Sequence, residues 1–312
     1  MPVIVTEFTD EHLPAAVALF TDRYAEALDR HPLLDREADL AAAVGAIRSA
    51  SSRGWVALDG DRVVGFLLSR VDGNATWVEL GGHAAVDEPV VRLLYAVAST
   101  AWVADGGLRH AVVLLTGDAA AEGAWARLAF GQEHVFALGP VEPSRTVAAP
   151  DVDVRVATTD ADLESLLDMC FIVDRHIAQA PVWSVRSPEL AATLPGMFSE
   201  DFANPEVFDF IASIDGVDVG FASWEPMPLR LGVPAGTVAF SHGAVRPAYR
   251  GRGVGATLDV AGRRWAIERG HTVTWSDWRL ANLAAEPHWR NLGWTPYATR
   301  WTRQLDPRVL AR

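Results

Sequence analysis

Apolar residues recur with two different spacings along this 312-residue chain. The run from Thr237 to Val245 has the composition of a β-strand, which Pro247 ends. The apolar residues that follow are three or four positions apart, so they share one face of a predicted helix that Gly270 ends. The residues on this face are Val254, Leu258, Ala261 and Trp265. Strand and helix patterns are interleaved in this way throughout, which favours an α/β fold of the α+β layer type.

The pattern occurs twice along the chain. Residues 55–66 match residues 211–221, and both contain an Asp-Gly pair between β-rich runs, which is a hairpin signal. Near the end of each half, residues 125–130 match residues 289–294, and each of these segments begins with Trp. The sequence therefore predicts two tandem domains of one fold.

The boundary between the repeats is expected in the segment Pro140–Pro150, which contains three Pro. We predict domains at residues 1–147 and 148–312. Matching Val86 to Val245 and Leu94 to Leu258 leaves the first half five residues shorter in this interval. The first copy is thus predicted to have kept the framework and lost a loop.

Composition adds few constraints. Half of the residues are hydrophobic and 12 are Trp, which is enough for two buried cores. The single cysteine, Cys170, excludes an internal disulfide framework and lies on an apolar helical face, so we expect a core residue. Residues 1–12 lack a basic region, and the weakly polar stretch 93–104 is too short to cross a membrane. We expect a cytoplasmic protein.

The net charge of -13 is unevenly distributed. Residues 246–312 contain 12 Arg and 5 acids, a local charge of +7, so the other 245 residues carry -20. An acidic body argues against nucleic acid as a partner and favours a cationic small molecule. A confined basic segment suits a small polyanionic ligand. We expect no metal site and no membrane partner, and a monomer and a homodimer both remain open.

The Gly/Arg segment 250–255 opens the helix that follows the strand 237–245. The first amides of a helix have no partner within it, and the helix dipole adds positive charge there. Glycines let the backbone approach a phosphate closely, and Arg250 and Arg252 add charge-assisted hydrogen bonds. The segment lacks the Lys of a P-loop and the position and spacing of a Rossmann fingerprint. It therefore indicates a pyrophosphate site of another kind.

Arg250-x-x-Gly253-x-Gly255 resembles the pyrophosphate loop of the GNAT superfamily of N-acetyltransferases, [QR]-x-x-G-x-[GA]. Asn282, followed after seven residues by Trp289 and then by Gly293-Trp294, resembles the closing N…Y…GF segment of that family. The resemblance implies a mixed, mostly antiparallel, splayed sheet flanked by helices in each copy, with acetyl-CoA bound by the second. It assigns to this cofactor Gly243, Ala244, Val245, Arg250, Gly251, Arg252, Gly253, Val254, Gly255, Ala256, Asn282 and Trp289.

The first copy resembles the same fold in its framework only. Asp87 and Glu88 stand where the phosphate would lie, and like charges repel. We therefore interpret it as a degenerate domain that does not bind coenzyme A productively.

The chemistry of amine acetylation requires a base for the amine and an acid for the departing thiolate. Many relatives use a Glu on the cofactor strand and a Tyr seven residues after the Asn. Residues 238–241 contain no acid, and the Tyr position holds Trp289, which is no useful acid. The substitutes that we consider are His242 on the strand, Asp277 after a fifth strand at 271–275, and Glu225 as a ligand for a cationic amine. His288 is expected on a helix surface.

The sequence thus predicts an acetyl-CoA-dependent N-acetyltransferase acting on a small amine in the C-terminal domain. The acidic body favours a cationic amine, and a pocket wall of about two of the Trp residues would suit an aromatic one. A non-catalytic acyl-CoA-binding protein and a scaffold that docks a partner remain alternatives, because the expected Glu and Tyr are missing.

Overall fold

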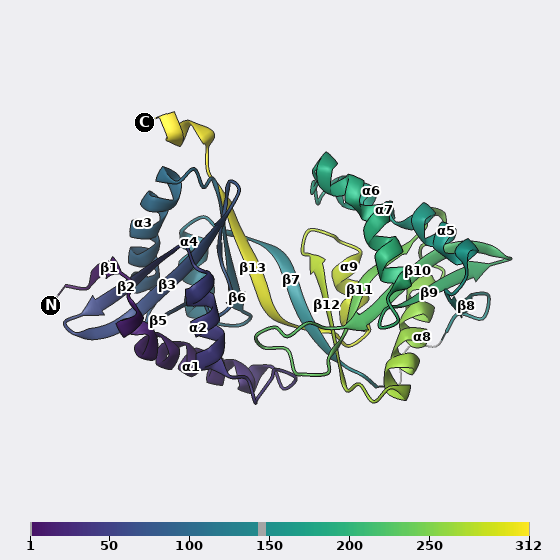
Figure 1. Cartoon of the computed structure of the whole chain (residues 1–312), viewed down its shortest axis with the longest axis horizontal. Coiled ribbons are helices and arrows are strands. Elements are labelled where there is room, and N and C mark those ends of the chain that lie inside the picture. Colours follow the sequence, from purple (N-terminus) through teal and green to yellow (C-terminus); the bar gives the residue numbers. More distant parts are fainter. Residues whose placement is uncertain (1, 143–147, 312) are drawn as a thin grey trace. The chain divides into compact units, whose positions relative to one another are not determined.

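The computed structural model describes residues 2–142 and 148–311 (Figure 1). The chain forms two compact units. Unit 1 contains Met1–Phe136 together with Pro296–Arg312, and unit 2 contains Ala137–Thr295. Both are mixed α/β layers with mostly antiparallel strands, which confirms the predicted fold class. No helix in the described part of the chain is long and apolar enough to cross a membrane.

Unit 1 is built on strands in the order β1-β2-β3-β4-β6-β13, with β5 paired to β3. Its helices are η1 (Asp10–His12), α1 (Leu13–Arg30), α2 (Leu40–Ala50), α3 (Glu88–Ala104), α4 (Ala119–Arg127) and η3 (Pro307–Ala311). Its strands are β1 (Ile4–Glu7), β2 (Arg53–Asp59), β3 (Arg62–Asp72), β4 (Ala75–Val78), β5 (His83–Ala85), β6 (Arg109–Leu115), the first part of β7 (Gly131–Pro140) and nearly all of β13 (Thr295–Gln304).

Unit 2 is built on strands in the order β8-β9-β10-β11-β12, followed by the end of β7. The strands are β8 (Asp153–Val156), β9 (Phe208–Ile214), β10 (Val217–Pro226), β11 (Val238–Val245) and β12 (Val273–Arg279). The helices are α5 (Asp160–Met169), α6 (Ile172–Ile177), α7 (Pro188–Ala203), η2 (Pro247–Tyr249), α8 (Val254–Glu268) and α9 (Ala285–Asn291).

Helices cover both faces of the unit 2 sheet, and strand alternation explains which residues each face presents. On one face Phe221 packs against Phe198 of α7, with ring centroids 5.5 Å apart. On the other, the fully buried Trp224 lies so close to α8 that a Cβ on Gly262 would come within 2.1 Å of its ring. Figure 1 shows α5–α7 and α8 on these opposite sides. Cys170 belongs to the core below α7, as expected for a packing residue.

Both Asp-Gly hairpins are present. In unit 2, Ile214 pairs with Val217, and the turn residues Asp215 and Gly216 have φ of 51° and 76°, the left-handed values that a two-residue hairpin turn requires. In unit 1, Asp59 pairs with Arg62, so the turn lies one residue later, at Gly60 and Asp61.

The last strand of each repeat leaves its own repeat. β13 belongs to unit 1 from Pro296 onward, where Ala298–Gln304 pair with β6, and the end of β7 lies beside β12 in unit 2. The predicted boundary at residue 147 lies outside the described residues. The basic segment 246–312 is not confined as expected, because β13 places Arg300 and Arg303 in unit 1.

The registers also correct the match between the repeats. Gly65 pairs with Ala85 in unit 1, and the equivalent Gly220 pairs with Val245 in unit 2. The strands therefore correspond with an offset of 160, so the first repeat is shorter by four residues instead of five. The match of Val86 to Val245 would have placed His83 at the position of His242, but the backbone pairing makes His83 the counterpart of Gly243.

Candidate functional site

Strands β11 and β12 part after two residue pairs. They run parallel, with Val238 opposite Thr274 and Ala239 opposite Trp275, and no further registered pair follows between these fully described strands. The pairing of β11 with β10 shifts by one residue at Ser241, which forms a β-bulge. The bulge puts Phe240 and His242 on opposite faces of the sheet. The parting of β11 and β12 leaves a V-shaped opening between them. Such an opening is expected of the splayed sheet that the GNAT resemblance implies.

The predicted anion loop lies at the wide end of this opening. Gly253 is the N-cap of α8 with φ 79°, and Gly251 has φ 76°, so both use the left-handed region that favours glycine. No side chain in the described part of the chain caps α8. Its first amides therefore point outward without a side-chain partner. Arg250, Gly251, Arg252 and Gly253 are exposed, which leaves this end of a 15-residue helix accessible to an anion.

A histidine that sequence reasoning missed connects the loop to Asn282. Arg250 Nη1 lies 3.4 Å from His176 Nδ1, and His176 Nε2 lies 3.1 Å from Asn282 Oδ1. The neutral tautomer with hydrogen on Nε2 satisfies both contacts, since Arg250 donates and Asn282 accepts. Asn282 Oδ1 also accepts a hydrogen bond from the amide of Ala284. Asn282 therefore orders the turn before α9, and no motif at His176 marked it in advance.

Aromatic side chains line the α8 side of the opening. The Phe240 ring covers Gly243, where an added Cβ would lie 2.4 Å from Phe240 Cζ. Trp289 packs edge-on against Phe240 with centroids 4.8 Å apart, and it stacks on Trp278. His288, expected on a helix surface, is half-buried: its Cε1 would lie 3.2 Å from a Cβ on Gly255, and desolvation lowers its pKa.

The three candidate catalytic residues lie on three strands beside the opening: Glu225 on β10, His242 on β11 and Asp277 on β12. His242 is half-buried, and its ring centroid is 5.5 Å from that of Phe198 on α7. Glu225 lies near the end of β10, opposite Ala239. Asp277 lies within β12 and not after it, since that strand extends to Arg279. The sequence predicts a pocket wall of about two Trp residues; in unit 2, Trp224, Trp275 and Trp278 are buried, whereas Trp183 is 72% exposed.

Residues 170–294 match the model of the Acetyltransferase (GNAT) family. This segment contains the opening, the loop and α9. Unit 2 carries a GNAT acetyltransferase domain. No curated protein matches the sequence.

Solved structures extend the GNAT fold to the whole chain. A GCN5-related N-acetyltransferase from Sphaerobacter thermophilus superposes with a TM-score of 0.61 at 13% identity, covering 97% of this chain and 96% of that one. A tandem GNAT protein from the clavulanic acid biosynthesis pathway gives 0.54 at 14% identity, covering 97% and 98%. A GNAT-family acetyltransferase from Colwellia psychrerythraea gives 0.53 at 13% identity, covering 98% and 100%. At these identities the likeness establishes a tandem GNAT fold and nothing about substrates.

The residues of the GNAT domain fit a coenzyme A diphosphate at the mouth of α8. The uncapped amides, the two left-handed glycines and the exposed guanidinium of Arg250 form the donor set that such an anion requires. Ala149 borders this mouth, because its amide donates to Thr257 Oγ1 at 2.9 Å. At the equivalent positions in unit 1, amides at the starts of the helices already donate to carboxylates.

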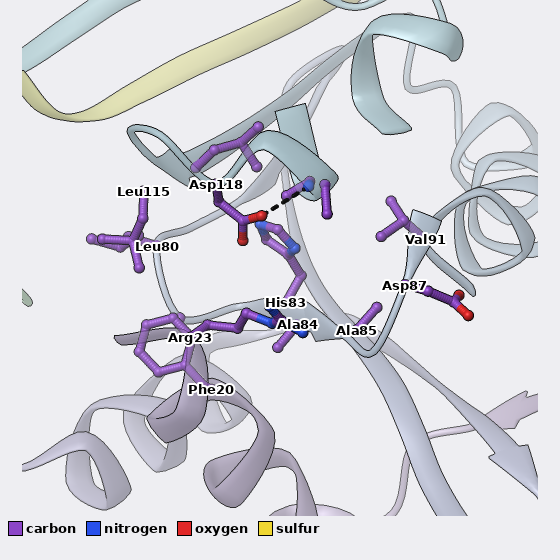
Figure 2. A pocket seen from close by; sticks show the side chains of 14 residues that line it. Phe20, Arg23, Leu80, His83, Ala84, Ala85, Asp87, Val91, Leu115 and Asp118 are labelled. Carbon is purple, nitrogen blue, oxygen red and sulfur yellow. Dashed lines mark hydrogen bonds between the residues drawn. The ribbon is translucent and has the colours of Figure 1, made fainter. Parts of the chain in front are cut away.

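In unit 1 the corresponding helix ends are capped by the protein's own carboxylates. Asp87 Oδ1 accepts from the amide of Val90 at the start of α3, and Asp118 Oδ1 accepts from the amide of Ala121 at the start of α4. A pocket of about 30 Å³ remains between these helix ends, lined by residues from β5, β6 and α1 (Figure 2). It holds a few water molecules at most.

His83 lies beside Asp118 in this pocket, as Figure 2 shows. Its ring packs edge-on against Trp125, the counterpart of Trp289, with centroids 5.8 Å apart. Burial lowers the pKa of His83 to about 4, so the ring is neutral at pH 7. An imidazole thus stands in unit 1 where unit 2 has the bare backbone of Gly243.

Proposed function

We propose that unit 2 is an acetyl-CoA-dependent N-acetyltransferase that acetylates a small, cationic amine. The observation that carries the proposal is the uncapped N-terminus of α8 with Gly253 in left-handed conformation, at the mouth of the opening between β11 and β12. The match of residues 170–294 to the GNAT family model supports it. In this proposal acetyl-CoA, when bound, supplies an activated acetyl thioester.

The chain's own residues would hold the coenzyme at two places. The amides from Gly251 to Ala256, with Arg250 and Arg252, would bind the diphosphate, and Asn282 would order the adjoining turn. Backbone groups of Gly243 to Val245 would bind the pantetheine amides, since this part of β11 pairs with β10 on one edge and has no registered pair with β12 on the other. Phe240 and Trp289 would exclude water from this side of the opening.

His242 is the proposed base, because it lies on β11 and an imidazole is the side chain best suited to accept a proton near neutral pH. An amine must lose one proton before its nitrogen can attack, and His242 would accept it. Glu225 and Asp277 would attract the cationic acceptor to this face through charge. Trp289 has no acidic proton to give, so the departing thiolate is not expected to depend on it.

Release of free thiol from acetyl-CoA in the presence of a panel of small amines tests the proposal. We expect turnover with cationic or aromatic amines that exceeds hydrolysis without an amine. His242→Gln should reduce kcat by about 100-fold or more, the usual contribution of a general base. Stabilisation of the protein against heat by acetyl-CoA, without thiol release by any amine, would favour the coenzyme-holding alternative. No stabilisation at high ligand excess would contradict any cofactor site.

A further inference from the structure

Three polar residues form a row across three neighbouring strands of unit 2. Asp209 on β9 is directly opposite Ser223 on β10, and Ser223 is directly opposite His242 on β11. Side chains of directly paired residues share one face and have Cβ atoms about 5 Å apart. The Ser223 hydroxyl donates a hydrogen bond to Asp209 Oδ1. A hydroxyl oxygen that donates its hydrogen keeps lone pairs, so Ser223 Oγ is able to accept a hydrogen bond from the imidazole of the paired His242.

The first and second members of this row are buried, at 5% and 4% exposure for Asp209 and Ser223. Burial is costly for a carboxylate, and it raises the pKa of Asp209. Charge on His242 acts in the opposite direction and lowers it. The two groups therefore interact although they lie on strands that are not adjacent.

The equivalent positions in unit 1 show whether the fold itself requires polar residues in this row. The equivalent pairs there are Gly54 with Leu68, and Leu68 with Gly82, whose carbonyl accepts from the Leu68 amide at 2.7 Å. The same three positions are thus filled by Gly, Leu and Gly. Because the fold forms with an apolar row, packing does not require Asp209 or Ser223. The polar row occurs in the repeat that carries the uncapped α8.

We propose that Asp209 is a positioning residue that stabilises the protonated form of His242 through Ser223. The inference rests on the proposed function in one respect: the proton that His242 takes up would come from an N–H bond of the ammonium substrate. When that bond breaks, a new N–H bond forms on His242. The other ring N–H donates to Ser223 Oγ, while the Ser223 hydroxyl continues to donate to the Asp209 carboxylate. No proton leaves the row, and the neutral amine is free to attack.

Other acids surround His242, so the row must be distinguished from general negative charge. Asp201 on α7 interacts with His242, and Glu225 on β10 adds to the field at Asp209. Asp277 lies on β12. Asp209 differs from all three in having a hydroxyl between it and the ring.

The test is an NMR titration of the histidine ring signals in the full-length, ligand-free protein, with His242 assigned through His242→Gln. Asp209→Asn keeps a hydrogen-bond acceptor for Ser223 and removes the charge. We expect it to lower the pKa of His242 by about one pH unit, as loss of a nearby opposite charge does. Ser223→Ala should lower it as well, because the connecting hydroxyl is gone. Asp215→Asn, in the exposed turn of the same hairpin, removes an equal charge and should leave the pKa of His242 in place.

An unchanged His242 pKa in Asp209→Asn and Ser223→Ala would overturn the inference, and so would an equal shift in Asp215→Asn. If Asp209→Asn does not fold, as judged by thermal unfolding, Ser223→Ala decides. This measurement needs neither coenzyme nor amine. If the His242 pKa shifts as expected but the protein acetylates no amine, the proposed function is contradicted and the inference about Asp209 still holds. In an active enzyme, Asp209→Asn should also move the acidic limb of the kcat profile to lower pH.

Discussion

At the scale of single residues, the two repeats differ where a coenzyme would contact them. Gly243 presents bare backbone in unit 2, whereas its counterpart His83 places an imidazole on the wall of the pocket in unit 1. Gly253 leaves the amides of α8 uncapped, whereas Asp87 binds the Val90 amide of α3. A carboxylate on the first amides of a helix is enough to close an anion site there, because phosphate must approach these backbone amides itself.

Arg250→Ala is expected to weaken binding of coenzyme A by at least about tenfold, which is ~1.4 kcal/mol, because it removes one charge-assisted bond to the diphosphate. Isothermal titration calorimetry measures the change. Arg264→Ala removes the same charge from the exposed side of α8 and should leave the affinity intact. Asp87→Asn in unit 1 should also have no effect. Equal affinity in Arg250→Ala and the wild type would remove the loop assignment.

At the scale of elements, a buried histidine between β6 and α3 makes the stability of unit 1 depend on pH. His110 of β6 is fully buried, and it accepts from or donates to Tyr95 of α3 at 2.8 Å through Nδ1. Its Nε2 lies 3.3 Å from the carbonyl oxygen of Gly107. Neutral imidazole satisfies both contacts, with Tyr95 donating and Gly107 accepting. Burial is the main reason why the pKa of His110 falls from 6.5 to about 4, and nearby Arg303 lowers it further.

A folded-state pKa below the unfolded value means that the unfolded chain binds the additional proton between pH 6.5 and 4. Stability from this group is thus complete above pH 6.5 and is lost as pH falls through that window, by on the order of 3 kcal/mol. Urea unfolding at several pH values measures the loss. His110→Gln should show a smaller loss of free energy of unfolding on acidification than the wild type. An identical pH dependence in both proteins would contradict the assignment.

At the scale of the whole molecule, the repeats are not independent segments of sequence. Unit 1 needs β13, whose residues Ala298–Gln304 pair with β6 and whose Trp301 belongs to the unit 1 core. A repeat that loses its last strand exposes both a sheet edge and part of a core. We therefore expect that a cut at the predicted domain limit would not release a first repeat that folds by itself.

A fragment that ends at Pro140 is expected to aggregate or to unfold without a cooperative transition, because it lacks β13. Far-ultraviolet circular dichroism during heating measures this. Joining residues 295–312 to the same fragment through a flexible linker should restore a cooperative transition, since it returns the missing pairs to β6. Cooperative unfolding of the fragment alone would show that the unit tolerates the loss and would favour domain limits close to the predicted residue 147.

The sequence by itself determined the repeat, the layer fold and the Gly/Arg loop, because hydrophobic spacing and glycine positions are local properties of a chain. It also indicated His242, Glu225 and Asp277. Only the tertiary structure decided that β13 belongs to unit 1 and that His83 corresponds to Gly243. Strand partners and register depend on contacts between distant segments, and a shift of one residue moves a side chain to the opposite face. His176 and the row from Asp209 to His242 became visible for the same reason, since only pairing across strands and helices brings them together.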